Sequence, residues 1–575
     1  MIAYAAGWRQ RRDWPRPLAH PMMRAPARGA SLPTTMLHDL NDYPDNAELA
    51  CDIAIVGGGA AGITLARHLA GHGVEVCLVE SGGRDFEAAT QDLAAGPDCG
   101  DPYYALVDAR LRFLGGTTNI WGGRCARFEA IDFEARPWVP LSGWPLTLED
   151  LEPWYAQAAR DFGLPAGAAA ACGWHDETAL RQGLDGDFVT RCWHFDNERE
   201  RFNAVRMDDL FAAGDVRVLL HANVTRIRIA REANRVEGLE LASLGGRRAR
   251  LVARHYVLAA GGIENARLML ASDDVESAGV GNRHDQVGRC FMEHPHARAG
   301  RLEPRAGFAL WAAFQRRQGT DGNEIAAVLL PAPALQREAG ILNTAFTFKL
   351  QRDSAQGVAL HKRLYNDLKH QLAPTRANRA LWHRYRALRR FIQHHVRQRV
   401  ESVRFARGVK RVNVMVRAEQ APNPDSRVRL AAERDALGMR RAALEWRLGE
   451  LDKRTVAVMV ERLGALLVAR GIGRLEPAAW LRESGTAWPV DATVGNHAIG
   501  GYHHMGTTRM SAAPVRGVVD RDCRVHGYAN LYVAGSSVFP TASWANPTLT
   551  IVALAHRLGD HLLRRVAASG GHVAP

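Results

Sequence analysis

The sequence contains no uninterrupted apolar run of the roughly 18 residues that a membrane-spanning helix needs, so no such helix is predicted. Its eight cysteines include no Cys-x-x-Cys pair, and their positions predict neither a metal site nor a disulfide framework. No apolar segment follows the basic pair Arg11 and Arg12, so we expect no signal peptide and a cytoplasmic protein. With 47% hydrophobic and 23% charged residues, the 575-residue chain is neither disordered nor collagen-like.

Positive charge is concentrated in one part of the chain. The formal net charge is +13, and residues 361–410 hold 14 Lys and Arg against Asp367 and Glu401, a local charge of +12. Such a segment is most often a solvated face, although it also suits a membrane surface, a polyanion or an acceptor protein. We expect its apolar stripe, which includes Leu381 and Leu388, to pack inward with the arginines outward, and no sequence-specific nucleic-acid binding.

A glycine-rich turn joins the first clear strand to the first clear helix. Residues 51–56 read as a buried strand, a helical pattern follows Gly62, and residues 74–79 form a second buried strand. Gly57 permits the tight turn, Gly59 lets the backbone approach a pyrophosphate, and Gly62 lets the helix pack closely on the sheet. Glu80 ends the second strand, where it is placed to accept hydrogen bonds from ribose hydroxyls.

Remote segments favour FAD over NAD as the dinucleotide. A second strand and turn at 257–262 and a strand at 531–534 resemble further parts of the same nucleotide-binding unit. The far end of a long cofactor must be held by segments remote in sequence, whereas an NAD enzyme normally has consecutive halves. These segments alone leave both cofactors open.

The order of elements predicts an α/β protein with a discontinuous Rossmann-type FAD-binding domain and an inserted α+β substrate, or cap, domain. The predicted parts are a disordered or non-native tail at 1–46, the first part of the FAD-binding domain at 47–290, the cap at 291–495, and the C-terminal FAD-binding part with catalytic residues at 496–575.

Five motifs occur in order along the chain: Gly57–Gly62 with Glu80, Leu114–Asn119, Val257–Leu270, Tyr502–Thr507, and Leu531–Pro540 followed by Asn546–Thr548. Together they resemble the glucose–methanol–choline (GMC) oxidoreductases, within the branch that holds pyranose oxidases and bacterial sugar or sugar-acid dehydrogenases. The resemblance implies FAD. It also implies non-covalent binding, because Ile120 stands where pyranose oxidases often carry the flavin-linking His. The aspartate common before Gly-Ser in the C-terminal signature is Gly535 here.

These motifs give the predicted cofactor-binding set. It comprises Gly57, Gly59, Ala60, Ala61, Gly62, Glu80, Ser81, Gly115, Gly116, Thr117, Asn119, Val224, Ala260, Gly261, Gly535, Ser536, Asn546, Pro547 and Thr548.

Alcohol oxidation by a flavin needs a base for the hydroxyl proton, and His suits that role. His503 lies three residues before Gly506, where the family's base falls, and its neighbour His504 should point the opposite way. Asn546 precedes Pro547 at a helix start, where Asn is a favoured cap, and the resemblance implies that it also bonds the substrate oxygen. The alternatives are a structural His pair and a metal site with His294 and His296.

The resemblance implies an FAD-dependent dehydrogenase or oxidase acting on the CH–OH group of a small sugar or polyol, with oxygen, a quinone or a redox protein as acceptor. One alternative is the same flavin scaffold running decarboxylation or elimination. Another is a flavoprotein that binds a membrane or polyanion through residues 361–410, and peripheral membrane contact is compatible with catalysis.

Overall fold

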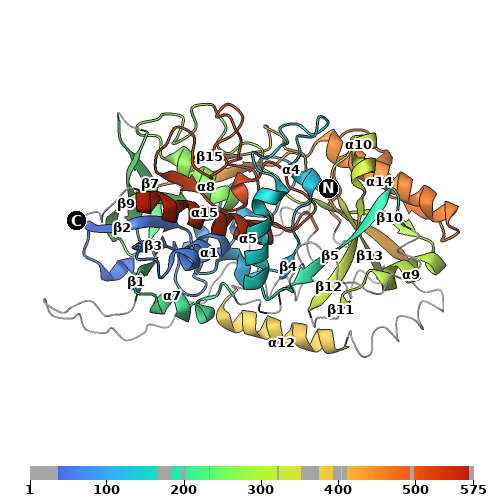
Figure 1. Ribbon diagram of the computed structural model, residues 1–575, viewed down its shortest axis with the longest axis horizontal. Helices are drawn as coiled ribbons and strands as arrows, with labels where there is room; N and C mark the ends of the chain where they lie inside the picture. Colours follow the sequence, from blue (N-terminus) through green and yellow to red (C-terminus); the bar gives the residue numbers. More distant parts are fainter. Residues whose placement is uncertain are drawn as a thin grey trace. The chain divides into compact units, whose positions relative to one another are not determined.

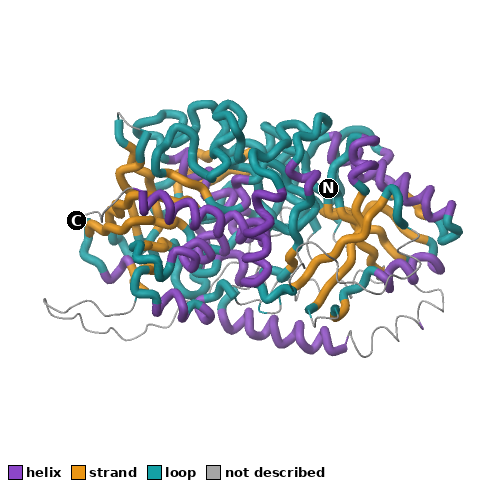
Figure 2. The backbone as a smooth tube through the Cα atoms, in the orientation of Figure 1, coloured by secondary structure: helices purple, strands orange, loops and turns teal. Residues whose placement is uncertain are grey.

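The computed structural model describes residues 36–165, 184–196, 198, 201–231, 234–319, 323–350, 374–392, 403, 411–491 and 498–568. Their strands gather in two large sheets and one separate hairpin. Figure 2 shows the two groups of strands in orange, with helices and long loops around each.

The first sheet is largely parallel. Its order is β1 (Leu37–Asp39), β6 (Val216–Leu220), β3 (Val76–Val79), β2 (Ala47–Val56), β9 (Arg248–Leu258), β8 (Val236–Ala242) and β7 (Asn223–Ile229), and β18 (Leu531–Val533) also pairs with β9. The pairs from β1 to β9 and the β9–β18 pair are parallel, whereas β8 runs antiparallel to both neighbours. Residues 53–56 are apolar and buried throughout, as expected of a central strand covered on both faces.

Three helices pack together beside this sheet (Figure 1): α1 (Ala60–Leu69), α5 (Leu148–Asp161) and α15 (Thr548–Ala568). Thr147 and Asp150 form a capping box that fixes the start of α5. α8 (Gly261–Ala271) follows β9 and contacts β7 and the hairpin of β15 (Arg427–Arg434) and β16 (Arg440–Glu445). The carboxyl ends of β2, β3 and β9 therefore lead directly into turns that precede helices or loops.

The second sheet is antiparallel. Its order is β17 (Leu475–Pro477), β10 (His296–Leu302), β14 (Val412–Arg417), β13 (Ala345–Leu350), β12 (Glu324–Pro331), β5 (Phe188–Phe195) and β4 (Arg124–Cys125), with β11 (Arg317–Gln318) on β12. α9 (Pro304–Ala313) and α14 (Glu450–Ala469) share a hydrophobic core with this sheet. The remaining described helices are α2 (Ala88–Asp92), α3 (Leu106–Ala109), α4 (Ala130–Phe133), α7 (Asp208–Ala212), α10 (Pro333–Ala339) and α12 (Arg376–Ile392).

The predicted α/β fold with a second, α+β unit is confirmed, and the structure corrects several details. Residues 37–42, assigned to the tail, form β1 and a 3-10 helix (Leu40–Asp42), and β1 pairs with β6 at the sheet edge. The two sheets do not separate at residue 290, since β4 and β5 come from the predicted FAD-binding part and join the second sheet. Cys192 on β5 is disulfide-bonded, where the sequence predicted no disulfide.

The prediction that the apolar stripe of the basic segment packs inward, with its arginines outward, is also wrong. On α12, Leu381 and Leu388 are 54% and 60% exposed, whereas Trp382 is buried and Arg379 pairs with Asp85 at 2.8 Å. The aromatic ring and one arginine therefore face inward, because Asp85 and the cavity described below lie on that side. Within the described ranges, no helix combines the length and apolarity needed to span a bilayer.

Candidate active site

A cavity of about 600 Å³ is lined by residues from both sheets and from the turns that follow their strands. One end is lined by the turns after β2, β3 and β9 and by the start of α15, and the other by strands of the second sheet together with Tyr502, His503 and Asn546. A volume of this order suits a cofactor or a small ligand. We call these the dinucleotide end and the substrate end.

The glycine turn at the dinucleotide end has the geometry that its spacing predicts. Gly57 has φ +112°, a left-handed value that glycine tolerates. A Cβ at Gly62 would lie 2.0 Å from the Gly57 carbonyl oxygen, so the helix can approach the turn this closely only with glycine there. A Cβ at Gly59 would meet no protein atom within 4 Å, which leaves open space above the N-terminus of α1.

Glu80 stabilises this turn from the end of β3. Its Oε2 accepts a hydrogen bond from the Gly58 N–H at 2.8 Å, and its Oε1 accepts from the Gly82 N–H at 2.9 Å and the Ser81 hydroxyl at 3.0 Å. A carboxylate oxygen has more than one acceptor direction, so Glu80 can hold the turn and still face the cavity that it lines.

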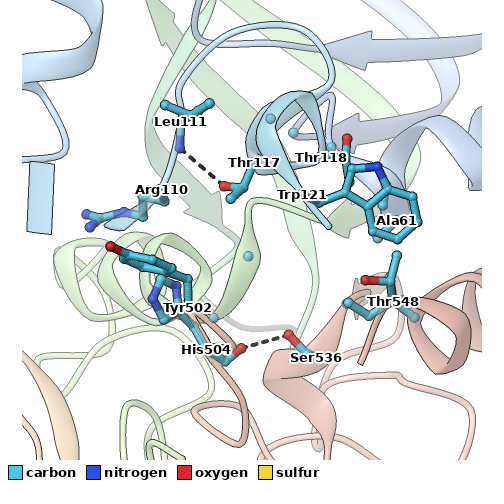
Figure 3. A pocket seen from close by; sticks show the side chains of 18 of the residues that line it. Ala61, Arg110, Leu111, Thr117, Thr118, Trp121, Tyr502, His504, Ser536 and Thr548 are labelled. Carbon is cyan, nitrogen blue, oxygen red and sulfur yellow. Dashed lines mark hydrogen bonds between the residues drawn. The ribbon is translucent and has the colours of Figure 1, made fainter. Parts of the chain in front are cut away.

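Most of the predicted cofactor-binding residues line the cavity. Besides Gly57, Gly59 and Glu80 they are Ala60, Ala61, Ser81, Gly116, Thr117, Val224, Ala260, Gly261, Gly535, Ser536, Asn546, Pro547 and Thr548. Three do not: Gly62 packs against the turn, Gly115 adopts φ +94°, and Asn119 donates to the carbonyl oxygens of Leu114 and Gly116. Figure 3 shows Ala61, Thr117, Ser536 and Thr548 around the same space.

The predicted catalytic pair lies together at the substrate end. The Asn546 Nδ2 is 3.0 Å from His503 Nε2, and on the other side of the ring His503 Nδ1 is 2.7 Å from His294 Nδ1. His294 is buried, and its Nε2 lies 2.8 Å from the Ser543 carbonyl oxygen and 3.2 Å from that of Ala542. These contacts form a continuous chain of polar groups.

The chain fixes which nitrogen of His503 carries the proton. Carbonyl oxygens only accept, so His294 Nε2 must be protonated. Burial lowers the pKa of His294 to about 4, so the ring is neutral near pH 7 and its Nδ1 accepts the hydrogen of His503 Nδ1. Burial, and then the neighbouring His294, His296 and Arg417, hold the pKa of His503 well below its usual value. His503 is therefore neutral with a bare Nε2, to which the Asn546 amide donates.

His504 does not simply point away from the cavity, as the sequence predicted. Both histidines line it, but their partners differ. His504 Nε2 lies 3.1 Å from the Tyr103 hydroxyl, and its carbonyl oxygen accepts from Ser536 at 2.7 Å (Figure 3). Tyr103 in turn donates to Glu293, whose carboxylate accepts the His503 backbone N–H at 3.0 Å. His504 and Glu293 thus hold the segment that carries His503.

Comparison with known proteins gives two family matches. Residues 422–555 match the model described as GMC oxidoreductase, and residues 52–279 match the model described as FAD dependent oxidoreductase. The chain is 23% identical to the fructose dehydrogenase large subunit of Gluconobacter japonicus, across 90% of this chain and 98% of that protein. It is 25% identical to the 6'''-hydroxyparomomycin C oxidase of Streptomyces lividus, across 97% and 98%.

The C-terminal part of the chain thus carries a GMC oxidoreductase domain, and the N-terminal part carries an FAD-dependent oxidoreductase domain. Solved structures agree in fold. Pyridoxine 4-oxidase from Mesorbium loti aligns with a TM-score of 0.50 at 15% identity, covering 91% of this chain and all of that one. An Aspergillus oryzae formate oxidase variant aligns with a TM-score of 0.52 at 17% identity, covering 92% and 100%.

This oxidoreductase is an FAD enzyme, and its dinucleotide end fits that cofactor. The open space at Gly59 lies at the N-terminus of α1, where backbone N–H groups and the helix dipole favour a pyrophosphate. Among the described residues, no cluster of three or more His, Cys, Asp or Glu has the arrangement of a metal site.

Sequence reasoning missed several lining residues. Glu264 on α8 forms ion pairs with Arg110, Arg112 and Arg267, and although burial alone would raise the pKa of Glu264, these arginines hold it below its usual value. No spacing rule links these positions. The sequence indicated His294 only as an alternative metal ligand beside His503. Its role as a hydrogen-bond partner of His503 depends on the fold, which brings the two rings together.

Proposed function

We propose that this oxidoreductase oxidises the CH–OH group of a sugar or polyol, with His503 as the base and Asn546 as its hydrogen-bonding partner. The observation that carries the proposal is the unprotonated Nε2 of His503, which accepts from the Asn546 amide, in a cavity that both residues line. Similarity to sugar dehydrogenases and oxidases supports the substrate class.

The chain's own residues supply the proton chemistry. His503 Nε2 accepts the hydroxyl proton of the substrate, and the Asn546 amide donates to the oxygen as negative charge develops there. Bound FAD supplies the hydride acceptor. His294 is a positioning residue: by accepting from His503 Nδ1, it keeps Nε2 free of a proton before the reaction.

We further propose that FAD is held without a covalent link by the cofactor-binding residues named above. Ile120 lines the cavity at the loop position expected to carry a linking His in pyranose oxidases. Acid precipitation should therefore release all flavin into the supernatant. A yellow pellet would contradict the proposal.

The decisive experiment is anaerobic flavin reduction by a panel of sugars and polyols, followed by stopped flow. We expect His503→Ala to retain FAD and to lose about 10² to 10⁴ in rate, the usual contribution of a general base. Asn546→Ala should lose rate, because its amide bonds His503 Nε2; α15 begins at Thr548, so we expect no loss of a helix cap. His504→Ala should slow reduction much less, because its side chain contacts Tyr103 rather than the base.

The variants separate the competing mechanisms. If His504→Ala loses the rate and His503→Ala does not, the base has been assigned to the wrong neighbour. If both reduce their flavin at the wild-type rate, the enzyme does not oxidise alcohols through this pair. His294→Gln should move the acid limb of the pH–rate profile, a change that simple loss of packing would not produce.

We also propose that the enzyme is cytoplasmic and makes peripheral contact with a membrane through α12. The exposed Leu381 and Leu388 flank Arg384 on the outer face of α12, which suits an anionic bilayer surface. Sedimentation with phosphatidylserine vesicles at low and high salt tests the contact, and Leu381→Ser should weaken it. Equal sedimentation of the variant and wild type would contradict it.

A further inference from the structure

The substrate end of the cavity is built on one face of the second sheet. Side chains alternate between the two faces of a strand. On β13 and β14, Phe348 and Val416 lie in the core shared with α14, whereas their neighbours Lys349 and Arg417 line the cavity. Arg124, at the start of β4 opposite Phe195 on β5, lines it as well.

This face carries positive charge. Arg124, Arg316, Lys349 and Arg417 line it. Arg316 is paired with Glu324 on β12, and the other three also have interactions within the chain. The two carboxylates among the described lining residues are Glu80, which accepts from the glycine turn, and Glu264, which is paired with three arginines.

Aromatic rings hold the guanidinium groups in place. The Arg124 and Arg417 guanidinium carbons each lie 5.3 Å from the centre of a Trp193 ring. Stacking of this kind preorganises the planar donor set of Arg for a planar or tetrahedral anion. The Arg417 Nη1 is also 3.3 Å from His296 Nε2, which fixes it on the neighbouring strand β10.

Arg417 and His503 line the same cavity. One small molecule in this cavity can therefore place an anionic group at Arg417 and a hydroxyl at His503 Nε2.

We propose that Arg417, with Lys349 and Arg124, forms an anion subsite that binds a carboxylate or phosphate of the substrate. The preferred substrates are then acidic sugars, not neutral ones. This inference rests on the proposed alcohol oxidation and deepens it. The anionic group takes no part in the reaction; it orients the substrate so that one hydroxyl meets the base, in the way that a bidentate Arg orients carboxylates generally.

The test uses the holoenzyme and four matched pyranoses: glucosamine, glucose, glucuronate and glucose 6-phosphate. Anaerobic flavin reduction is measured at low substrate concentration. We expect the better of the two anions to exceed glucose by about 10- to 100-fold, the usual value of a hydrogen bond to a charged group, and glucosamine to be slowest. Glucuronate and glucose 6-phosphate distinguish a carboxylate subsite from a phosphate subsite.

Variants then assign the effect to one residue. Arg417→Gln should remove the preference for the anion, measured as the ratio of the rates with the anion and with glucose, and Arg417→Lys should restore part of that ratio. Arg337→Gln, on the exposed surface of α10, is the matched control that also removes one positive charge.

Two other outcomes have separate meanings. If glucose reduces the flavin as fast as both anions, or if Arg417→Gln slows all four compounds equally, the subsite is wrong and alcohol oxidation stands. If neither these compounds nor the wider alcohol panel reduces wild-type flavin, the proposed function is wrong and the subsite falls with it.

Discussion

The two ends of the cavity are built in different ways. The dinucleotide end consists mostly of backbone, with glycine turns after β2 and β9 and the start of α1. The substrate end consists of side chains from segments far apart in sequence, such as Arg124, Arg417 and His503. One end is specified by residues a few positions apart, and the other by how distant strands pair. Mutations should therefore affect them in different ways.

The largest expected effect is at Gly59. Asp is a favoured N-cap, so Gly59→Asp should keep α1 intact, but it places a negative charge in the space suited to a pyrophosphate. We expect complete loss of bound FAD and of activity, with unfolding of the apo-protein unchanged within about 1 kcal/mol. Flavin absorbance after gel filtration and urea unfolding of both apo-proteins measure the two effects.

Gly62→Ala is the matched comparison at the same turn. Its Cβ would lie 2.0 Å from the Gly57 carbonyl oxygen, so it should destabilise the apo-protein itself. If Gly59→Asp retains FAD, or if it destabilises the apo-protein as much as Gly62→Ala does, the turn does not hold the cofactor in the way described.

This contrast explains what could be predicted from sequence. The strand, the glycine spacing and Glu80 are local, so the turn and most of its neighbours in the cavity were predictable. The match of 502–507 to a family segment located His503. The partner His294 was visible but was considered as a metal ligand, because its role depends on which nitrogen meets a carbonyl oxygen at Ser543.

The cations of the substrate end were not predictable, because strand order and register decide which residues meet there. Arg417 faces the cavity because β14 pairs with β10 and β13, which lie over 100 and about 70 residues earlier in the chain. The same register places His296 of β10 directly opposite Arg417. The helix α12 shows the same limit. Its periodicity was visible, but the inward side was decided by Asp85 and the cavity.

The second prediction concerns a buried support of the substrate end. Glu419 forms an ion pair with Arg136 at 2.6 Å, with both side chains fully buried, and it also accepts the backbone N–H of Ser543 at 3.2 Å. Because the Ser543 carbonyl accepts from His294, this pair supports the chain that orients His503, the proposed base. Glu419→Gln leaves a buried Arg without its counter-charge and should cost about 3–5 kcal/mol of unfolding free energy.

The control for this change is Glu134→Gln, which breaks the exposed pair with Arg337 at 2.8 Å. Exposed pairs contribute about 0–1 kcal/mol, so this variant should unfold nearly as the wild type does. Urea denaturation of both variants gives the two values. Equal and small losses would show that the buried pair adds nothing beyond a surface pair.

The smallest effect concerns pH, and here the two ends differ in sign. The pKa of His294 at the substrate end is lowered, so the unfolded chain takes up its proton first, and stability falls as pH drops below about 6.5. At the dinucleotide end, His221 bonds Asp39 at 2.5 Å and Glu87 at 2.8 Å. These carboxylates raise the pKa of His221 to about 10.

For His221 the dependence of stability on pH has the opposite sign. Below about pH 6.5 both the folded and the unfolded chain carry its proton, so its full stabilisation is present. Above that pH the unfolded chain loses the proton while the folded chain keeps it, and the stabilisation disappears as pH rises through the folded pKa of about 10. Since these side chains are partly exposed, we expect a contribution of about 1 kcal/mol.

Measuring the unfolding free energy of wild type and His221→Gln at pH 6, 8 and 10 isolates the contribution of His221 from other groups that titrate there. The two curves of unfolding free energy against pH should converge as the pH rises. Parallel curves would mean that β1 is held by strand pairing alone.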